Sequence, residues 1–188
     1  DVYLDANGQA NITYLDLDSG LYDSCGIVSC NIDSSNFSCA NVGAQVTVTL
    51  VVTDPSGNMD STTSVVTVID TVSPTAISLN AYTVYLNSVG TVTISSDSVN
   101  NGSYDSCGIA SISLDDSVFV CSDLNQFPVI TMTVVDVNGN SSTSQTTVTV
   151  LDTVNPIAAA QDIDVYLDAT GNATIVPLDI DNGSSDNC

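Results

Sequence analysis

The sequence contains no lysine, arginine or histidine, and its 22 acidic residues give a formal net charge of −22. Glutamate and tryptophan are also absent, so every acidic residue is an aspartate. A chain without cationic side chains cannot neutralise phosphates, which argues against binding to nucleic acid or insertion at an anionic membrane. We expect the missing positive charge to come from divalent cations, and Ca²⁺ is the best candidate because it prefers oxygen ligands.

The same absences argue against an active site. No histidine is present for general-base chemistry, and no lysine or arginine can stabilise an oxyanion or a phosphate. Two aspartates could act as an acid and a base, but a glycosidase also needs a cleft, which small repeated β domains seldom provide. We therefore expect that the protein is not an enzyme, with the accessory region of an enzyme as an alternative.

One motif recurs along the chain. Tyr22-Asp-Ser-Cys-Gly-Ile27 returns as Tyr104-Asp-Ser-Cys-Gly-Ile109 and begins again at Ser185-Asp-Asn-Cys188. The first cysteines of these motifs are spaced by 82 and 81 residues, and residues 1–25, 83–107 and 164–188 align without a gap. A fixed period of this size predicts tandem repeats. Since the chain begins and ends within a repeat, we expect it to be part of a longer protein.

The composition and the alternation of side chains predict an all-β fold. Apolar residues at 46, 48, 50 and 52 alternate with threonine and valine, as in a sheet with one buried face. Turn signals separate seven short strands in each repeat, which favours an immunoglobulin-like β-sandwich over a five-stranded barrel. The proline-containing linkers place the domains at 1–73 (lacking its first strand), 74–155 (complete) and 156–188 (the start of a third repeat).

The six cysteines predict disulfides and hence an oxidising compartment. Cys25 and Cys39 are 14 residues apart, and so are Cys107 and Cys121. This matched spacing predicts one local disulfide per repeat, which would join the strands of a hairpin. Cys30 has no counterpart in the second repeat, so we interpret it as a buried thiol, with a link to another chain as the alternative.

Two groups of aspartates are candidate Ca²⁺ ligands. The first lies in the acidic loop after the second strand, and the second where one repeat ends and the next begins. Carboxylates close together can wrap around Ca²⁺, whereas the alternative is that each aspartate caps its own turn. The loop candidates are Asp16, Asp18, Asp23, Asp105, Asp179, Asp181 and Asp186, and the junction candidates are Asp54 with Asp70 and Asp136 with Asp152.

The order of these motifs resembles that of a known repeat. Asp179-Ile-Asp-Asn-Gly-Ser-Ser-Asp-Asn-Cys188, Cys107-Gly-Ile109, Phe119-Val-Cys121 and Thr133-Val-Val-Asp-Val-Asn-Gly-Asn140 together resemble the hyalin-type (HYR) immunoglobulin-like repeats of large Bacteroidetes surface and gliding adhesins. The resemblance implies type IX secretion and display on the cell surface. It also implies O-glycosylation at aspartate–hydroxyl–apolar triplets, although such triplets also arise by chance in this composition. Those candidates are Thr71, Thr153, Ser98 and Ser117.

These observations predict a structural stalk or spacer segment of an extracellular adhesin or filament, stiffened by Ca²⁺ and disulfides within each repeat. The alternative is a module that binds glycans or proteins through its exposed loops. Neighbouring repeats of the same chain are the expected partners, together with surface glycans or other copies of the filament.

Overall fold

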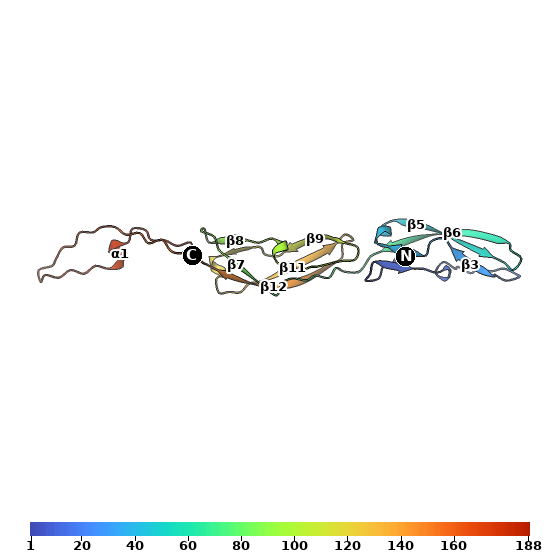
Figure 1. The fold of residues 1–188 in the computed structure, drawn as a ribbon, viewed down its shortest axis with the longest axis horizontal. Coiled ribbons are helices and arrows are strands. Elements are labelled where there is room, and N and C mark those ends of the chain that lie inside the picture. Colours follow the sequence, from blue (N-terminus) through green and yellow to red (C-terminus); the bar gives the residue numbers. More distant parts are fainter. The chain divides into compact units, whose positions relative to one another are not determined.

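The computed structural model describes residues 1–188 and contains two similar tandem β domains of about 90 residues each (Figure 1). The all-β prediction is therefore confirmed. No helix is long and apolar enough to cross a membrane.

By its contacts the chain divides into two compact units, which are described separately. Unit 1 comprises Asp1–Ile77, Gly102–Ser113 and Thr133–Thr143. Unit 2 comprises Ser78–Asn101, Leu114–Met132 and Ser144–Cys188. Each unit thus combines most of one repeat with the region of the following repeat that contains its first cysteine.

Two sheets form the first domain. The larger sheet has the strand order β1-β6-β5-β3, in which β6 is antiparallel to β5 and parallel to β1, and β3 is antiparallel to β5. The smaller sheet pairs β2 with β4 in antiparallel register. The strands are β1 (Val2–Tyr3), β2 (Gln9–Asn11), β3 (Ser29–Ile32), β4 (Asn36–Ser38), β5 (Gln45–Thr53) and β6 (Met59–Ile69).

Alternating apolar side chains of both sheets form the core of this domain. Ala10 and Phe37 come from the smaller sheet, and Val48, Val66 and Val68 come from the larger one. All five are at most 9% exposed, while the threonines between the valines of β5 are exposed or half-buried. Burial of one face of each strand fixes the register, because a slip of one residue would turn the valines towards water.

The second domain repeats this arrangement, with the sheets β7-β12-β11-β9 and β10-β8. Its strands are β7 (Ala81–Tyr85), β8 (Thr91–Thr93), β9 (Ile109–Leu114), β10 (Val118–Val120), β11 (Val129–Asp136) and β12 (Ser141–Leu151). Short 3₁₀ turns follow the strands of the smaller sheets: η1 (Tyr14–Asp16), η2 (Cys39–Asn41), η3 (Ser96–Ser98) and η4 (Cys121–Asp123).

The first strand expected of the complete repeat, just after Pro74, is reduced to two isolated bridges, Thr75 with Tyr104 and Ser78 with Asn100. The complete repeat therefore has six strands and not the expected seven, while the first domain has the six expected of a repeat that lacks its first strand. Residues 156–188 contain only bridges and one helical turn, α1 (Pro177–Ile180). In the first domain β1 and β2 pair with β6 and β4, and this chain holds no third copy of those two partner strands.

Candidate functional site: two disulfide-linked repeat junctions

Each disulfide connects the last cysteine of one repeat with the first cysteine of the next. Cys39 is bonded to Cys107 within unit 1, with their Cα atoms 5.1 Å apart. Cys121 is bonded to Cys188 within unit 2, with their Cα atoms 5.4 Å apart. The predicted pairing inside each repeat is therefore wrong, and Cys25, expected to be bonded, is free and exposed.

Strand direction explains why the local pairing fails. Hydrogen bonds between Asp5 and Gln9 close the turn that joins β1 to β2, so β2 runs opposite to β1. Because β3 and β6 are both antiparallel to β5, and β4 is antiparallel to β2, β3 and β4 run in the same direction in different sheets. They do not form the predicted hairpin.

Cys25 and Cys39 consequently lie near opposite ends of the first domain. Ser29, just after Cys25, pairs with Thr53 at the tip of the β5–β6 hairpin. Val42, just after Cys39, bridges to Val68 near the other end of β6. β6 has 11 residues, which corresponds to about 37 Å at the rise of a strand. A disulfide requires Cα atoms within about 7 Å of each other.

A glycine contacts the sulfur atom at each junction. Gly8 (φ +71°) and Gly90 (φ +72°) form the turn between the first two strands of their repeats. A Cβ atom would lie 2.5 Å from Sγ of Cys39 at Gly8, and 2.6 Å from Sγ of Cys121 at Gly90. Positive φ and the absence of a side chain are therefore both required at these positions.

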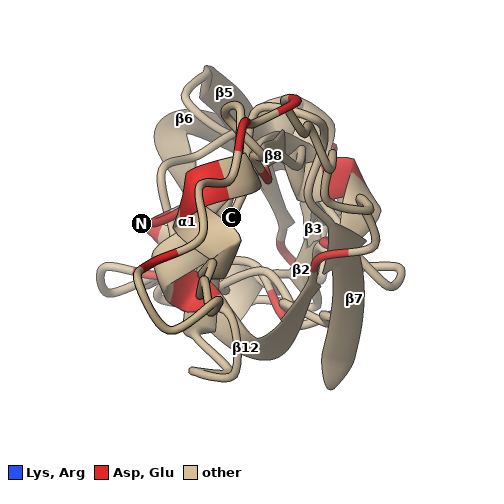
Figure 2. Ribbon diagram, turned by 90° about the vertical axis from the view of Figure 1, so that its left-hand side faces the viewer, with Lys and Arg blue, Asp and Glu red and all other residues tan.

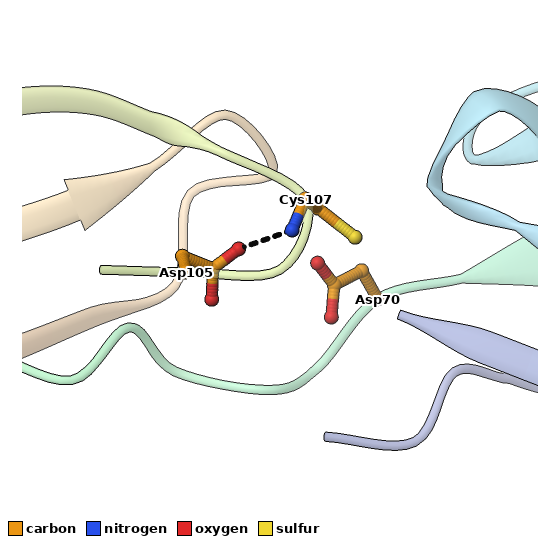
Figure 3. Close-up of side chains that lie close together, drawn as sticks. All are labelled: Asp70, Asp105 and Cys107. Atoms are coloured by element: carbon orange, nitrogen blue, oxygen red, sulfur yellow. Dashed lines mark hydrogen bonds between the residues drawn. The ribbon is translucent and has the colours of Figure 1, made fainter. Parts of the chain in front are cut away.

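At the first junction, Asp70 and Asp105 approach each other beside Cys107 (Figure 3). One potential ligand atom of each residue lies within 4.8 Å of the others. Asp70 follows β6, is only 7% exposed, and accepts a hydrogen bond from the amide of Val72 through Oδ1 (3.0 Å). Its other oxygen, Oδ2, is buried without a hydrogen-bond partner. A buried carboxylate oxygen without a partner is unfavourable unless a cation or water compensates it.

The chemistry of this group suits a hard cation. Cys107 cannot serve as a thiolate ligand because its sulfur is bonded to Cys39. The two carboxylates remain, and Oδ1 of Asp105 is also held by the amides of Cys107 (2.7 Å) and Gly108 (3.1 Å). The group could therefore hold a metal ion, and a donor set of oxygens only favours Ca²⁺ or Mg²⁺ over softer metals.

Asn140 connects this site with the turn after β11. Its Nδ2 donates to the main-chain oxygen of Asp70 (3.3 Å) and to Oδ2 of Asp136 (2.9 Å). Asp136 is 1% exposed and also accepts from the amides of Asn138 and Asn140, so it fixes its own turn. The predicted proximity of Asp54 to Asp70 is wrong, because the whole of β6 separates them and they lie at its opposite ends.

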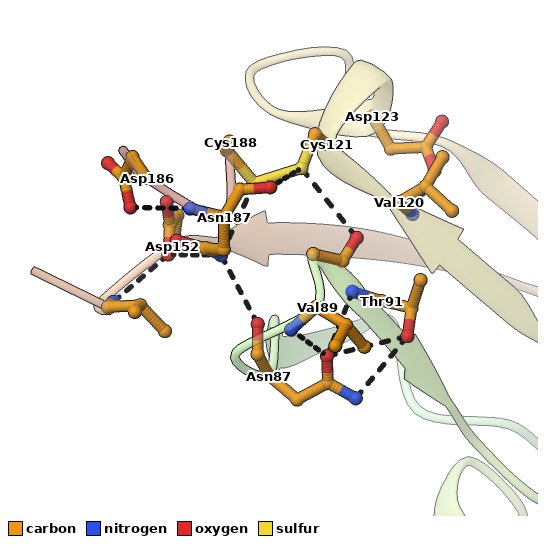
Figure 4. Close-up of a disulfide and its surroundings, with 12 residues drawn as sticks. Asn87, Val89, Thr91, Val120, Cys121, Asp123, Asp152, Asp186, Asn187 and Cys188 are labelled. Carbon is orange, nitrogen blue, oxygen red and sulfur yellow. Dashed lines mark hydrogen bonds between the residues drawn. A yellow bond between two sulfur atoms is a disulfide. The ribbon is translucent and has the colours of Figure 1, made fainter. Parts of the chain in front are cut away.

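The second junction has the same plan with a different donor (Figure 4). Asp152 corresponds to Asp70, and Asn187 stands where the first junction has Ser106. Nδ2 of Asn187 donates to Oδ1 of Asp152 (3.1 Å) and to the main-chain oxygen of Asn87 (3.2 Å). Ser106 instead donates to the main-chain oxygen of Ala6 (2.8 Å). Here the buried oxygen without a partner is Oδ1 of Asn187, which carries no formal charge.

The loop aspartates are held by their own turns. Asp16 accepts from the amide and hydroxyl of Thr13, and Asp18 accepts from the amides of Gly20 and Leu21. Backbone amides favour the ionised form and lower the pKa of both carboxyl groups. Hydrogen bonds from Asn58 and Ser184 likewise lower the pKa of Asp54 and Asp181. Three more aspartates each accept a hydrogen bond from a nearby backbone amide: Asp23, Asp179 and Asp186.

Of the predicted metal ligands, only Asp70 and Asp105 come together in a group of three or more possible ligand residues. The other aspartates lie in loops, in short helical turns and near strand ends, with no basic residue among them (Figure 2).

The other predicted positions vary in exposure. Thr71 and Thr153 are exposed, whereas Ser98 and Ser117 are half-buried. Cys30 is a half-buried free thiol in β3, opposite Val52. Glycosylation at the four hydroxyls stays a prediction.

Fold and site together define the protein as a tandem β-domain protein whose successive repeats are joined by disulfides. Two disulfides indicate an oxidising location outside the cytoplasm. Comparison with models of known protein families and with curated proteins found no match. The resemblance to hyalin-type repeats therefore stays a prediction.

Proposed function

We propose that this chain is a structural segment of an extracellular stalk, in which Ca²⁺ and disulfides join successive repeats of the HYR type. The observation that carries the proposal is the pairing of the cysteines. Both disulfides connect one repeat to the next, and neither closes a repeat on itself. A bond of this kind adds nothing to a ligand site on a single domain, but it prevents neighbouring domains from separating.

Calcium is assigned to the first junction. Asp70 and Asp105 would hold it, and the ion would neutralise the buried oxygen of Asp70 that has no partner. Two carboxylates supply fewer than the six to eight oxygens that Ca²⁺ takes, so water would complete the shell. We expect a dissociation constant of about 0.1–1 mM, as in other extracellular modules.

Thermal unfolding of residues 1–188 tests the calcium site. With 10 mM Ca²⁺ against a chelator at equal ionic strength, the native state should gain about 1.4 kcal/mol for a dissociation constant of about 1 mM. Asp70→Asn should abolish most of this gain. Asp60→Asn is the matched control, because it removes the same charge from an exposed residue of β6. Equal calcium responses in the two variants would remove the site from the proposal and leave only a diffuse counterion effect.

The number of repeats tests the stalk itself. Chains with one, two and four additional copies of residues 74–155 should increase in maximum dimension in proportion to the copy number, measured by small-angle X-ray scattering. Their binding to cell surfaces or glycan arrays should not change with copy number. Binding that grows with each copy would instead support a ligand-binding module.

A further inference from the structure

The disulfides shorten the covalent path through the chain. From Cys39 a bond leads directly to Cys107, and from Cys121 another leads directly to Cys188. A force that pulls on the two ends of the chain follows the shortest covalent route. That route comprises residues 1–39, 107–121 and 188, about 55 of the 188 residues. Residues 40–106 and 122–187 lie outside it.

We propose that these cysteines form a covalent spine that carries tension along the tandem repeats and makes them nearly inextensible. The spine is defined here as residues 1–39, 107–121 and 188 with the two disulfides. The bypassed segments are residues 40–106 and 122–187. The biological use of the spine rests on the proposed stalk function, but its existence depends only on the cysteine pairing.

The part of the spine that crosses a complete repeat, from Cys107 to Cys121, already consists mainly of extended strands. Between Cys107 and Cys121 it consists mainly of β9 and β10, which occupy the sheet positions of β3 and β4. β3 and β4 follow one another in the same direction, as derived above from their pairing. Strands rise about 3.3–3.4 Å per residue, close to the 3.3–3.6 Å limit of a stretched chain. Unfolding of a bridged repeat therefore adds little length.

The bypassed segments contain the parts of each domain whose unfolding requires the most free energy. They include the β5–β6 hairpin and all of β11 and β12, whose buried residues form much of the core. Tension does not pass through these strands, so it cannot draw them out into a longer chain. In an ordinary tandem β protein, by contrast, every residue of an unfolded domain adds to the length.

Single-molecule stretching of residues 1–188 between handles at the two ends tests the spine. The oxidised chain should reach a contour length of about 190 Å, at about 3.5 Å per residue. After reduction by a dithiol the length should rise more than threefold, to about 660 Å. In that reaction each S–S bond takes up two electrons and two protons to give two thiols, while the dithiol closes to its own disulfide.

Variants separate the two bonds. Cys121→Ser with Cys188→Ser should release residues 122–187 and add about 230 Å to the oxidised contour length. Cys25→Ser with Cys30→Ser is the control, and it should leave the length unchanged because both thiols are free. An oxidised wild-type chain that stretches as far as the reduced chain would overturn the spine.

Calcium distinguishes this result from a failure of the proposed function. Asp70 and Asp105 belong to a bypassed segment, so a chelator should leave the final contour length the same. A short oxidised contour together with ligand binding that grows with copy number would keep the spine and reject the stalk.

Discussion

The two junctions have an equivalent disulfide, glycine turn and strand-end aspartate, but the groups around that aspartate differ. Ser106 at the first junction donates to Ala6, whereas Asn187 at the second donates to Asp152. Oδ2 of Asp70 is buried without a partner, whereas Asp152 is half-buried and has no buried oxygen without a partner.

The comparison shows how a repeat can keep its covalent architecture while its electrostatics change. A buried carboxylate without a partner is far more unfavourable than a buried amide oxygen, because the carboxylate is charged. The first junction therefore has a physical reason to take up a cation, which the second junction, with its half-buried aspartate, lacks. In a chain with a net charge of −22, we propose that this difference decides which junctions depend on external calcium.

The glycine shared by the two junctions gives the largest expected effect. An alanine at position 90 would have its Cβ 2.6 Å from Sγ of Cys121 and 2.8 Å from the main-chain oxygen of Asn187. We expect Gly90→Ala to lower the free energy of unfolding by about 2–4 kcal/mol, from the positive φ and the overpacking together. Urea unfolding measures this loss, and labelling of thiols in denaturant reports whether Cys121 and Cys188 still pair.

Gly171→Ala is the matched control, since this glycine occupies the same turn in the third repeat at φ +81° with nothing within 4 Å of its Cβ position. Only the backbone penalty of about 1–2 kcal/mol applies there, and the two disulfides should form normally. Gly8→Ala should affect only the bond between Cys39 and Cys107. Equal losses in Gly90→Ala and Gly171→Ala would show that the sulfur contact is unimportant.

The sequence predicted the strands well because their signal is local. Alternation identified the buried face of β5, where Val48 and Leu50 are at most 3% exposed and Val46 and Val52 are half-buried. The sequence overestimated how much of a strand forms in the short segment after Pro74. A strand at an edge gains few hydrogen bonds, and its existence depends on its neighbours.

The cysteine pairing was not predictable from spacing. Separations of 68 and 67 residues between bonded cysteines are as regular along the chain as the separation of 14 that predicted local bonds. Which cysteines pair depends on whether β3 and β4 form a hairpin or continue in one direction through two sheets. That arrangement is a property of the tertiary fold. The same holds for Asp54 and Asp70, which β6 places at its two ends.

An exchange of the two differing side chains tests the comparison most directly. Ser106→Asn should place an amide beside Asp70, as Asn187 lies beside Asp152, and should weaken calcium binding about tenfold, equivalent to about 1.4 kcal/mol. Asn187→Ser should remove the amide donor from Asp152 and create calcium dependence at the second junction. Isothermal titration with Ca²⁺ and melting in a chelator measure the two changes.

In the chelator, Ser106→Asn should melt above the wild type, because the new donor compensates the carboxylate without a metal. If Ser106→Asn binds calcium as the wild type does, the difference between the junctions does not arise from this residue. The exposed copy of the same position, Ser24, provides the control, since Ser24→Asn adds the same amide where no strand-end aspartate has been brought beside it in this chain.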